Sequence, residues 1–285
     1  MTAVSDSIII TRDLTHAYQV GPLWHTALSG VGLEIARGSC AAIVGVTGSG
    51  KSTLVQHFNG LLRPTSGTIV VDGVDVHATA ADLRPLRRRV GMLFQSPEAQ
   101  LFAPTLFADV AFGPRRMGLA PEEVRTRVGA ALEAVGLPPH IYAARSPFDL
   151  SGGQMRRAAL AGVLAIEPSV LVLDEPTVGL DADGRAEFYA YVRQAQRERG
   201  VTVVLVSHDM AEVAALADRL FVLHAGRLVA QGPPRDVFAE GERLREWGLL
   251  APPLAELLAA LRRQGLAAPA DIGTVDEVFA WLRGI

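Results

Sequence analysis

A glycine-rich loop that ends in Lys-Ser constrains the fold of this chain more than any other segment. Its two glycines, separated by four residues and followed at once by lysine and serine, fit the phosphate-loop pattern. An apolar run at residues 41–44 precedes the loop, and a helical pattern at residues 53–58 follows it and stops at Asn59 and Gly60. We therefore predict a buried parallel strand, a loop and a helix N-terminus that bind an anion. The loop consists of Gly45, Val46, Thr47, Gly48, Ser49, Gly50, Lys51, Ser52 and Thr53.

Lys51 is the only lysine among the 27 basic residues of the chain. An ammonium group is a compact charge on a flexible stem, whereas a guanidinium group is a wide planar fork. A sequence that uses arginine at every other basic position but keeps lysine here indicates a role that needs the narrower group. We interpret Lys51 as the residue that reaches between phosphates, and Ser52 as the hydroxyl offered to Mg²⁺.

The composition limits the class of protein to which the chain can belong. Its 285 residues are 49% hydrophobic and 20% charged with a net charge of -3, the profile of one elaborated globular domain plus a small appendage. A nucleic-acid-binding protein would usually be basic, so we expect no nucleic-acid partner. The single cysteine, Cys40, excludes a disulfide within the chain and favours a reducing, intracellular setting. Residues 1–6 lack the features of a signal peptide, and no window reaches the ~18 apolar residues of a membrane span.

A second buried strand predicts the other half of the site. Residues 170–173 are all apolar, and Asp174 and Glu175 follow them directly. This places two carboxylates at the carboxyl edge of the sheet, where open α/β folds bind their ligands. We expect Asp174 to hold Mg²⁺ through its water shell and Glu175 to act as the general base on the attacking water. Together with the phosphate loop, this pair predicts binding and hydrolysis of ATP.

A second glycine-rich helix start, without a lysine, comes before an apolar helix that runs to about Ile166. It can receive an anion but cannot enclose one. It consists of Leu150, Ser151, Gly152, Gly153 and Gln154. With Asp-Glu-Pro-Thr about 20 residues later, it makes residues 8–232 resemble the ATP-binding-cassette (ABC) ATPases.

The resemblance implies an α/β fold with a phosphate-loop NTPase core, in which helices flank a RecA-like mixed sheet. It also implies an antiparallel β subdomain, an inserted helical subdomain at about residues 96–165, and a short helical C-terminal extension at residues 233–285. The ATPase domain would then occupy residues 1–232. In this family residues 150–154 of one subunit close over the ATP held by another, so the resemblance implies a dimer that is nearly inactive as a monomer.

Individual site residues also match the family pattern. Gln95 matches the glutamine that senses metal and water, His208 the histidine at the γ-phosphate, and Asp181 the aspartate of the loop that faces the partner subunit. Tyr18 matches the aromatic residue that stacks on adenine, although Trp24 and His16 stand close enough to be alternatives.

Residues 94–102 and 109–114 resemble the energy-coupling-factor branch, whose ATPases drive uptake of vitamins or of cobalt and nickel ions. The resemblance implies a groove that receives short helices from a transmembrane coupling subunit, a separate substrate-binding membrane subunit, and a peripheral location on the cytoplasmic face of the cell membrane. The alternative is that these residues only pack the helical subdomain. Residues 119–136 then predict an amphipathic helix with Val124, Val128, Leu132 and Val135 on one face.

The extension shows two apolar stripes on short helices. One contains Leu254, Leu257, Leu258 and Leu261; the other contains Val275, Val278, Phe279 and Leu282, after a capping box formed by Thr274 and Glu277. The stripes pack either on their own chain or on the same region of a partner ATPase, and the resemblance favours the partner.

Two alternative functions are weighed against transport. A soluble ABC ATPase of DNA repair or chromosome maintenance should carry coiled coils, zinc insertions or a basic face, and a translation regulator should carry tandem cassettes. The sequence shows none of these features. It identifies neither the transported solute nor whether the dimer contains one kind of ATPase or two.

Overall fold

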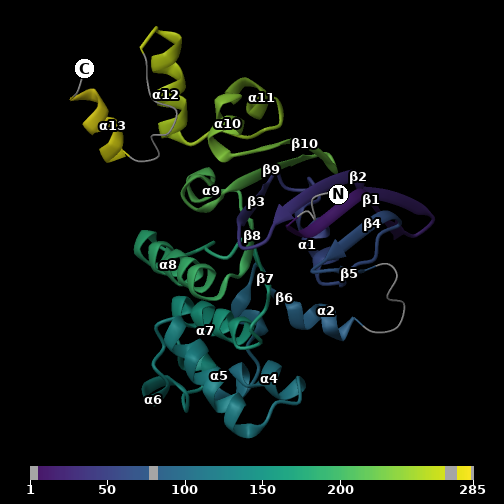
Figure 1. The fold of residues 1–285 in the computed structure, drawn as a ribbon, viewed down its shortest axis with the longest axis vertical. Helices are drawn as coiled ribbons and strands as arrows, with labels where there is room; N and C mark the ends of the chain where they lie inside the picture. Colours follow the sequence, from purple (N-terminus) through teal and green to yellow (C-terminus); the bar gives the residue numbers. More distant parts are fainter. Residues whose placement is uncertain (1–5, 77–82, 267–274, 284–285) are drawn as a thin grey trace.

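The computed structural model describes residues 6–76, 83–266 and 275–283. Its described strands form two sheets (Figure 1). The larger sheet has the order β10-β9-β3-β8-β7-β6, in which β10 alone runs antiparallel to its neighbour. Its strands are β3 (Cys40–Val44), β6 (Val90–Leu93), β7 (Val170–Asp174), β8 (Thr202–Val206), β9 (Arg219–His224) and β10 (Arg227–Gly232). The antiparallel sheet, in the order β2-β1-β4-β5, contains β1 (Ser7–Val20), β2 (Leu23–Ala36), β4 (Ser66–Val71) and β5 (Val74–Asp75).

Strands β3, β7 and β8 are buried at every residue because both faces of the larger sheet are covered. Side chains alternate between the two faces, as the period of a strand requires. In β7, Val170 and Val172 join the core between the two sheets, whereas Leu171 and Leu173 join the core under the helical subdomain. The continuous apolar run in the sequence therefore predicted a central strand correctly.

Helix α1 (Lys51–Phe58) lies between the two sheets. Its Leu54, Val55 and Phe58 are fully buried in the same core as residues of β1, β3 and β7. The helix was expected to begin at residue 53, and this is wrong by two residues because Gly50, with φ 103°, already serves as the N-cap. Lys51 and Ser52 therefore stand on the first helical turn. The predicted stop is confirmed, because Asn59 is the C-cap and Gly60 has a φ of 68°.

The helical subdomain lies at the bottom of Figure 1, below the sheet. Val124, Val128 and Leu132 of its helix α5, together with Val135 just beyond the end of the helix, are buried, which confirms the amphipathic face predicted from the sequence. Helix α2 (Arg84–Arg89) precedes β6 in the chain. Between β6 and β7 the chain forms η1 (Pro97–Gln100), α3 (Leu106–Val110), α4 (Phe112–Arg116), α5 (Pro121–Ala134), α6 (Pro139–Tyr142), η2 (Pro147–Asp149) and α7 (Gly152–Leu164). Helices α8 (Ala182–Arg199) and α9 (Met210–Leu216) connect the later strands.

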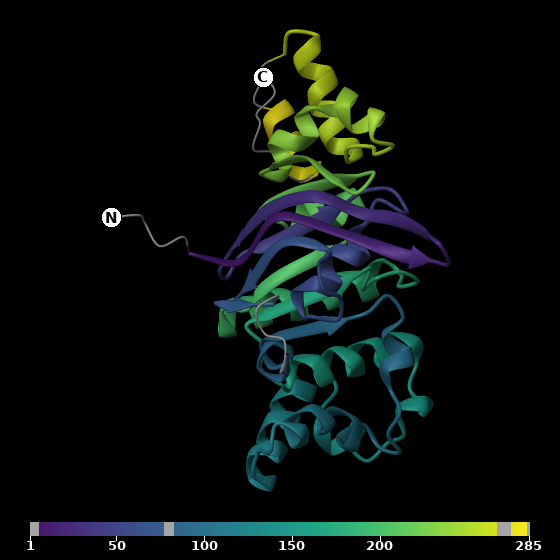
Figure 2. The same cartoon turned by 90° about the vertical axis from the view of Figure 1, so that its right-hand side faces the viewer.

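The C-terminal extension lies at the opposite end of the molecule from the helical subdomain, as Figures 1 and 2 both show. It contains α10 (Pro234–Ala239), α11 (Gly241–Glu246), α12 (Pro253–Arg263) and α13 (Val275–Leu282). The strand β10 ends at Gly232, where the sequence predicts the domain boundary. However, the first half of the extension shares a core with the sheet, because Phe238 and Leu244 pack in one cluster with Ala42 and Val44 of β3.

The two apolar stripes of the extension meet each other in part. Leu258 of α12 and Val278 of α13 are buried together, whereas Leu257 is 48% exposed and Phe279 is 57% exposed. Among the side chains that the structure describes, packing within the chain therefore covers Leu258 and Val278 and leaves Leu257 and Phe279 largely in solvent. Thr274 of the predicted capping box lies outside the described residues.

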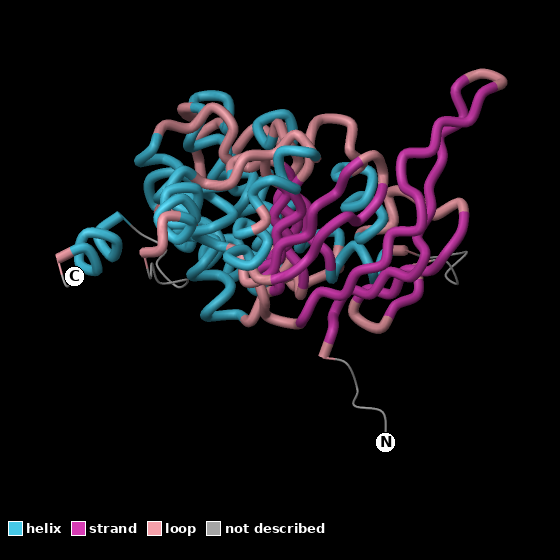
Figure 3. Tube along the Cα trace, turned by 90° about the horizontal axis from the view of Figure 1, so that it is seen from above, coloured by secondary structure: helices cyan, strands magenta, loops and turns pink. Residues whose placement is uncertain are grey.

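The β1–β2 hairpin projects from the body of the molecule at the right of Figure 3.

In the described part of the chain, no helix combines the length and the apolar character needed to cross a membrane.

Candidate nucleotide-binding site

Close backbone contacts explain the glycines of the phosphate loop. A Cβ atom on Gly45 would lie 2.2 Å from the carbonyl oxygen of Leu223, and a Cβ atom on Gly50 would lie 2.6 Å from the carbonyl oxygen of Ala27. Both approaches are shorter than any side chain allows, so the loop can follow this path only with glycine at both positions. The loop leads directly from β3 into α1, which directs the helix N-terminus toward an anion.

The side chain of Lys51 folds back into this loop. Its Nζ donates hydrogen bonds to the carbonyl oxygens of Gly45, at 2.7 Å, and Val46, at 3.2 Å. Burial lowers the pKa of Lys51, while the nearby charges of Glu175 and Asp174 raise it. The ammonium group is thus held inside the loop by two carbonyl groups, in a space that suits a narrow cation.

Ser52 and Asp174 form a pair of oxygen donors at the edge of the sheet. The Ser52 hydroxyl is hydrogen-bonded to the carboxylate of Asp174, which is buried at the end of β7. Burial raises the pKa of Asp174, and the hydrogen bond with Ser52 lowers it. Two hard oxygen atoms on adjacent elements are the donor set that Mg²⁺ prefers, so these residues fit the predicted metal.

Glu175 and His208 face each other from neighbouring strands. The N–H group of Glu175 donates to the carbonyl oxygen of Val206 at 2.9 Å, and its Oε2 makes a short hydrogen bond with Nδ1 of His208. Glu175 also has a φ of 52°, in the left-handed region that few non-glycine residues adopt. The backbone after β7 therefore turns the Glu175 carboxylate toward the imidazole of His208.

A cavity of about 740 Å³ joins several of the predicted residues. Its lining includes Gly45, Val46, Thr47, Lys51, Gln95, Glu175 and His208. The structure thus brings the phosphate loop, the predicted base and the two polar sensors to one place. Residues 248–253 of the C-terminal extension also line this cavity, and the sequence did not predict them there.

Residues 150–154 do not belong to the lining of this cavity. Ser151 and Gln154 form a reciprocal capping box at the start of α7, with N···O distances of 3.3 and 3.0 Å, and Leu150 is buried in the core of the helical subdomain. Asp181 caps α8 in a similar way, because its Oδ1 accepts from the N–H group of Gly184 at 2.8 Å. Both segments form helix starts, and neither contributes a residue to the lining of the cavity that contains Lys51.

Tyr18 stands beside the start of α1. Its hydroxyl group is 3.2 Å from Oγ1 of Thr53, and its ring makes an edge contact with His16 at 4.6 Å between centroids. Trp24 extends from the hairpin and is 64% exposed. Tyr18 is held by two neighbours whereas Trp24 is free in solvent, which keeps Tyr18 as the predicted adenine contact.

No sequence motif includes Glu212, a buried carboxylate behind the site. It is hydrogen-bonded to Ser207, which precedes His208, and to Tyr189 of α8. The hydroxyl of Tyr189 lies 3.1 Å from that of Thr177, two residues after Glu175. Burial raises the pKa of Glu212. This network connects the segment after β7 to the segment after β8. The only sequence signal for it is the position of Glu212 on a helix, four residues after His208.

His57 lies beneath Tyr18 in a chain of two buried imidazoles. Its Nδ1 is 2.7 Å from the carbonyl oxygen of Thr53 and must donate, because a carbonyl only accepts. Its Nε2 therefore accepts, and Nδ1 of His16 lies 3.3 Å from it. Burial lowers the pKa of His57 to about 4, so the folded protein holds this ring neutral.

The depressed pKa of His57 predicts a loss of stability in mild acid. As the pH falls from 6.5 toward 4, His57 becomes protonated in the unfolded chain but stays neutral in the folded chain. Between pH 7 and pH 5 this should remove about 2 kcal/mol from the free energy of unfolding. Urea unfolding at both pH values should show this extra loss in the native sequence and not in His57→Asn. Equal losses in the two proteins would contradict the assignment.

The fold and the site define a phosphate-loop ATPase whose core carries an antiparallel sheet, an inserted helical subdomain and a helical extension. The family model described as ABC transporter matches residues 28–178. The energy-coupling factor transporter ATP-binding protein EcfA2 of Symbiobacterium thermophilum is 52% identical over 278 residues, which cover 97% of this chain and 96% of the relative.

Solved structures agree with this relationship. CbiO1 of Clostridium perfringens, described as part of the ABC transporter complex CbiONQ, has a TM-score of 0.76 and 40% identity over 89% of this chain and 99% of its own. The cassette MJ0796, in a dimeric post-hydrolysis state bound to ADP and Pi, has a TM-score of 0.70 and 29% identity over 79% of this chain and 98% of its own. The chain belongs to the ABC transporter family, among the ATP-binding proteins of energy-coupling factor transporters, and is an ABC-type ATPase.

Proposed function

We propose that this chain is the ATPase subunit that energises an energy-coupling factor transporter for uptake of a vitamin or of a cobalt or nickel ion. The observation that carries the proposal is the 52% identity to an EcfA2 protein over 97% of the chain, which includes the extension. CbiO1, part of a transporter complex, is also similar over 89% of this chain. Neither comparison favours a role in DNA repair or translation.

In this proposal each predicted site residue has a separate chemical role. Lys51 and the loop N–H groups bind the phosphates, and Ser52, Asp174 and Gln95 hold Mg²⁺. When bound, Mg²⁺ supplies positive charge that offsets the charge of the phosphate oxygens. Glu175 takes a proton from the attacking water, and His208 orients the Glu175 carboxylate and reaches the γ-phosphate. Tyr18 stacks on the adenine.

We propose that the working unit is a dimer with a second ABC ATPase subunit. The cavity that contains Lys51 has no lining residue from 150–154, and those residues form the start of α7 elsewhere in the same chain. A partner subunit would supply that helix start to the ATP, and its Asp181 loop would face this chain. The dimeric state of MJ0796 with ADP and Pi supports this arrangement. The division between an ATPase domain at residues 1–232 and an extension that joins the dimer interface belongs to the same proposal.

A groove on the helical subdomain is the proposed contact for a transmembrane coupling subunit. It has a volume of about 690 Å³ and lies between α2, α4 and the end of α7, with Phe112, Gly113, Met117 and Ile166 among its apolar residues. Phe102 and Phe112 are large exposed side chains in edge contact at 5.1 Å between centroids. Both belong to the segments that resemble the energy-coupling-factor branch. Docking there would hold the chain on the cytoplasmic face of the membrane.

Co-purification tests the proposed function. The tagged chain, isolated from detergent-solubilised native membranes, should retain an integral membrane protein that stimulates its ATPase activity. Phe112→Ser should reduce this retention about tenfold, a loss typical of one central aromatic contact. Leu23→Ser, on the hairpin and 72% exposed, removes a similar apolar side chain far from the groove and should have no effect. Recovery of the chain with nucleic acid or ribosomes, and without a membrane protein, would contradict the proposal.

A further inference from the structure

The segment between α11 and α12, residues 248–253, approaches the nucleotide site from outside the ATPase core. Its residues line the same cavity as Val46, Lys51, Glu175 and His208. No motif of the family runs through this segment, and its sequence, Gly-Leu-Leu-Ala-Pro-Pro, carries no titratable group. Its side chains therefore bring no charge into the site, and what they can contribute is packing.

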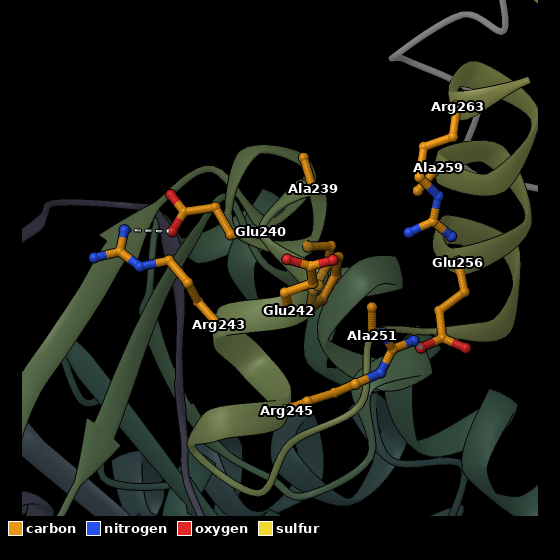
Figure 4. A pocket seen from close by; sticks show the side chains of 11 residues that line it. Ala239, Glu240, Glu242, Arg243, Arg245, Ala251, Glu256, Ala259 and Arg263 are labelled. Atoms are coloured by element: carbon orange, nitrogen blue, oxygen red, sulfur yellow. Dashed lines mark hydrogen bonds and ion pairs between the residues drawn. The ribbon is translucent and has the colours of Figure 1, made fainter. Parts of the chain in front are cut away.

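Two anchors hold this segment against the core. Leu249 and Ala251 are buried in the cluster that contains Ala42 and Val44, residues of the strand that leads into the phosphate loop. Arg245 of α11 and Glu256 of α12, on either side of the segment, also form an ion pair at 2.8 Å. Figure 4 shows Arg245 and Glu256 meeting next to Ala251. The segment is thus held at a set distance from the loop.

Gly248 lies close to Val46 of the phosphate loop. A Cβ atom at this position would lie 2.9 Å from Cγ1 of Val46, whereas ordinary contacts lie between 3.4 and 4 Å. Gly248 also has a φ of 73°. Gly265, at the end of the next helix, has a φ of 87° as well, but its Cβ atom would meet nothing within 4 Å. The two glycines share the positive φ, but a side chain would meet the phosphate loop only at position 248.

We propose that residues 248–253 are a positioning element of the nucleotide site, which holds the outer side of the phosphate loop through the contact between Gly248 and Val46. The loop binds phosphate with converging N–H groups, so its affinity depends on their placement. Because this segment leads into α12, a movement of the C-terminal helices would also move the residues that pack beside the phosphate loop. The inference rests on the proposed role of this loop in binding ATP.

Gly248→Ala and Gly265→Ala form a matched pair that tests this role. Both substitutions put a side chain at positive φ and should lower stability similarly. Only Gly248→Ala introduces a steric clash with Val46, so it should weaken binding of a fluorescent ADP analogue to the full-length protein by about tenfold. Gly265→Ala should bind within about twofold of the native sequence. Urea unfolding of each variant shows that both are folded. Equal affinities in the two variants would overturn the proposal.

A rescue separates contact with the loop from general damage. Val46→Ala removes the atom that the new methyl group meets, so Val46→Ala with Gly248→Ala should bind the analogue about as tightly as Val46→Ala alone. Additive losses would overturn the proposal. Val46→Ile adds a methyl group from the loop side, so it should weaken binding of the analogue and can be tested even if Gly248→Ala does not fold. Native affinity in Val46→Ile would also overturn the proposal. If the native protein bound no nucleotide, the proposed function itself would fail, and the inference with it.

Discussion

Replacing Glu175 with glutamine should stop ATP turnover and leave ATP binding intact. Glutamine keeps the shape of the side chain but cannot take a proton from water. The residues predicted to hold the phosphates and the metal, Lys51, Ser52 and Asp174, are separate from it. Phosphate release by the assembled transporter should fall by at least about 100-fold. The Kd for ATP, measured by equilibrium titration, should stay within about twofold of the native value.

The same substitution should also trap a dimer. If ATP joins two subunits and hydrolysis separates them, Glu175→Gln should give a stable dimer in light scattering when ATP and Mg²⁺ are present, and the native protein should not. Glu187→Gln is a suitable control, because Glu187 carries the same carboxylate on the exposed side of α8 and should change neither turnover nor association. Full hydrolysis by the Glu175→Gln complex would falsify the assignment of Glu175 as the base.

Lys51→Arg should weaken ATP binding although it preserves the charge. The ammonium group sits between the carbonyl oxygens of Gly45 and Val46, and the residue is only 9% exposed. A planar guanidinium group is too wide for that space, so it must leave the loop or spread it. We expect the Kd for ATP to rise by about 100-fold, with little change in the free energy of unfolding.

A titration with a fluorescent ATP analogue measures this effect. Arg235→Lys, the reverse exchange at a largely exposed position of α10, is the control and should bind the analogue like the native protein. Native affinity in Lys51→Arg would mean that the shape of the lysine is not the reason why the sequence keeps it there.

The sequence by itself determined the elements whose signal is local. The apolar runs at residues 41–44 and 170–173 became central strands because both faces of the sheet are covered, and the spacing of Val124, Val128 and Leu132 reflects the period of a buried helix face. The glycines of the loop were recognised from their spacing, but the contacts that exclude a Cβ atom at Gly45 and Gly50 come from Leu223 and Ala27 on distant strands. Helix ends were less accurate, as the start of α1 shows.

Only the tertiary structure decided which distant segments meet. It put Gly248 against Val46, about 200 residues apart in the chain, and it buried Glu212 between Ser207 and Tyr189. It also kept residues 150–154 out of the cavity that contains Lys51. Contacts of this kind depend on the order of the strands in the sheet and on which helices cover each face. A local pattern of residues does not predict that arrangement. Periodicity shows that a residue is buried, but only packing determines its neighbours.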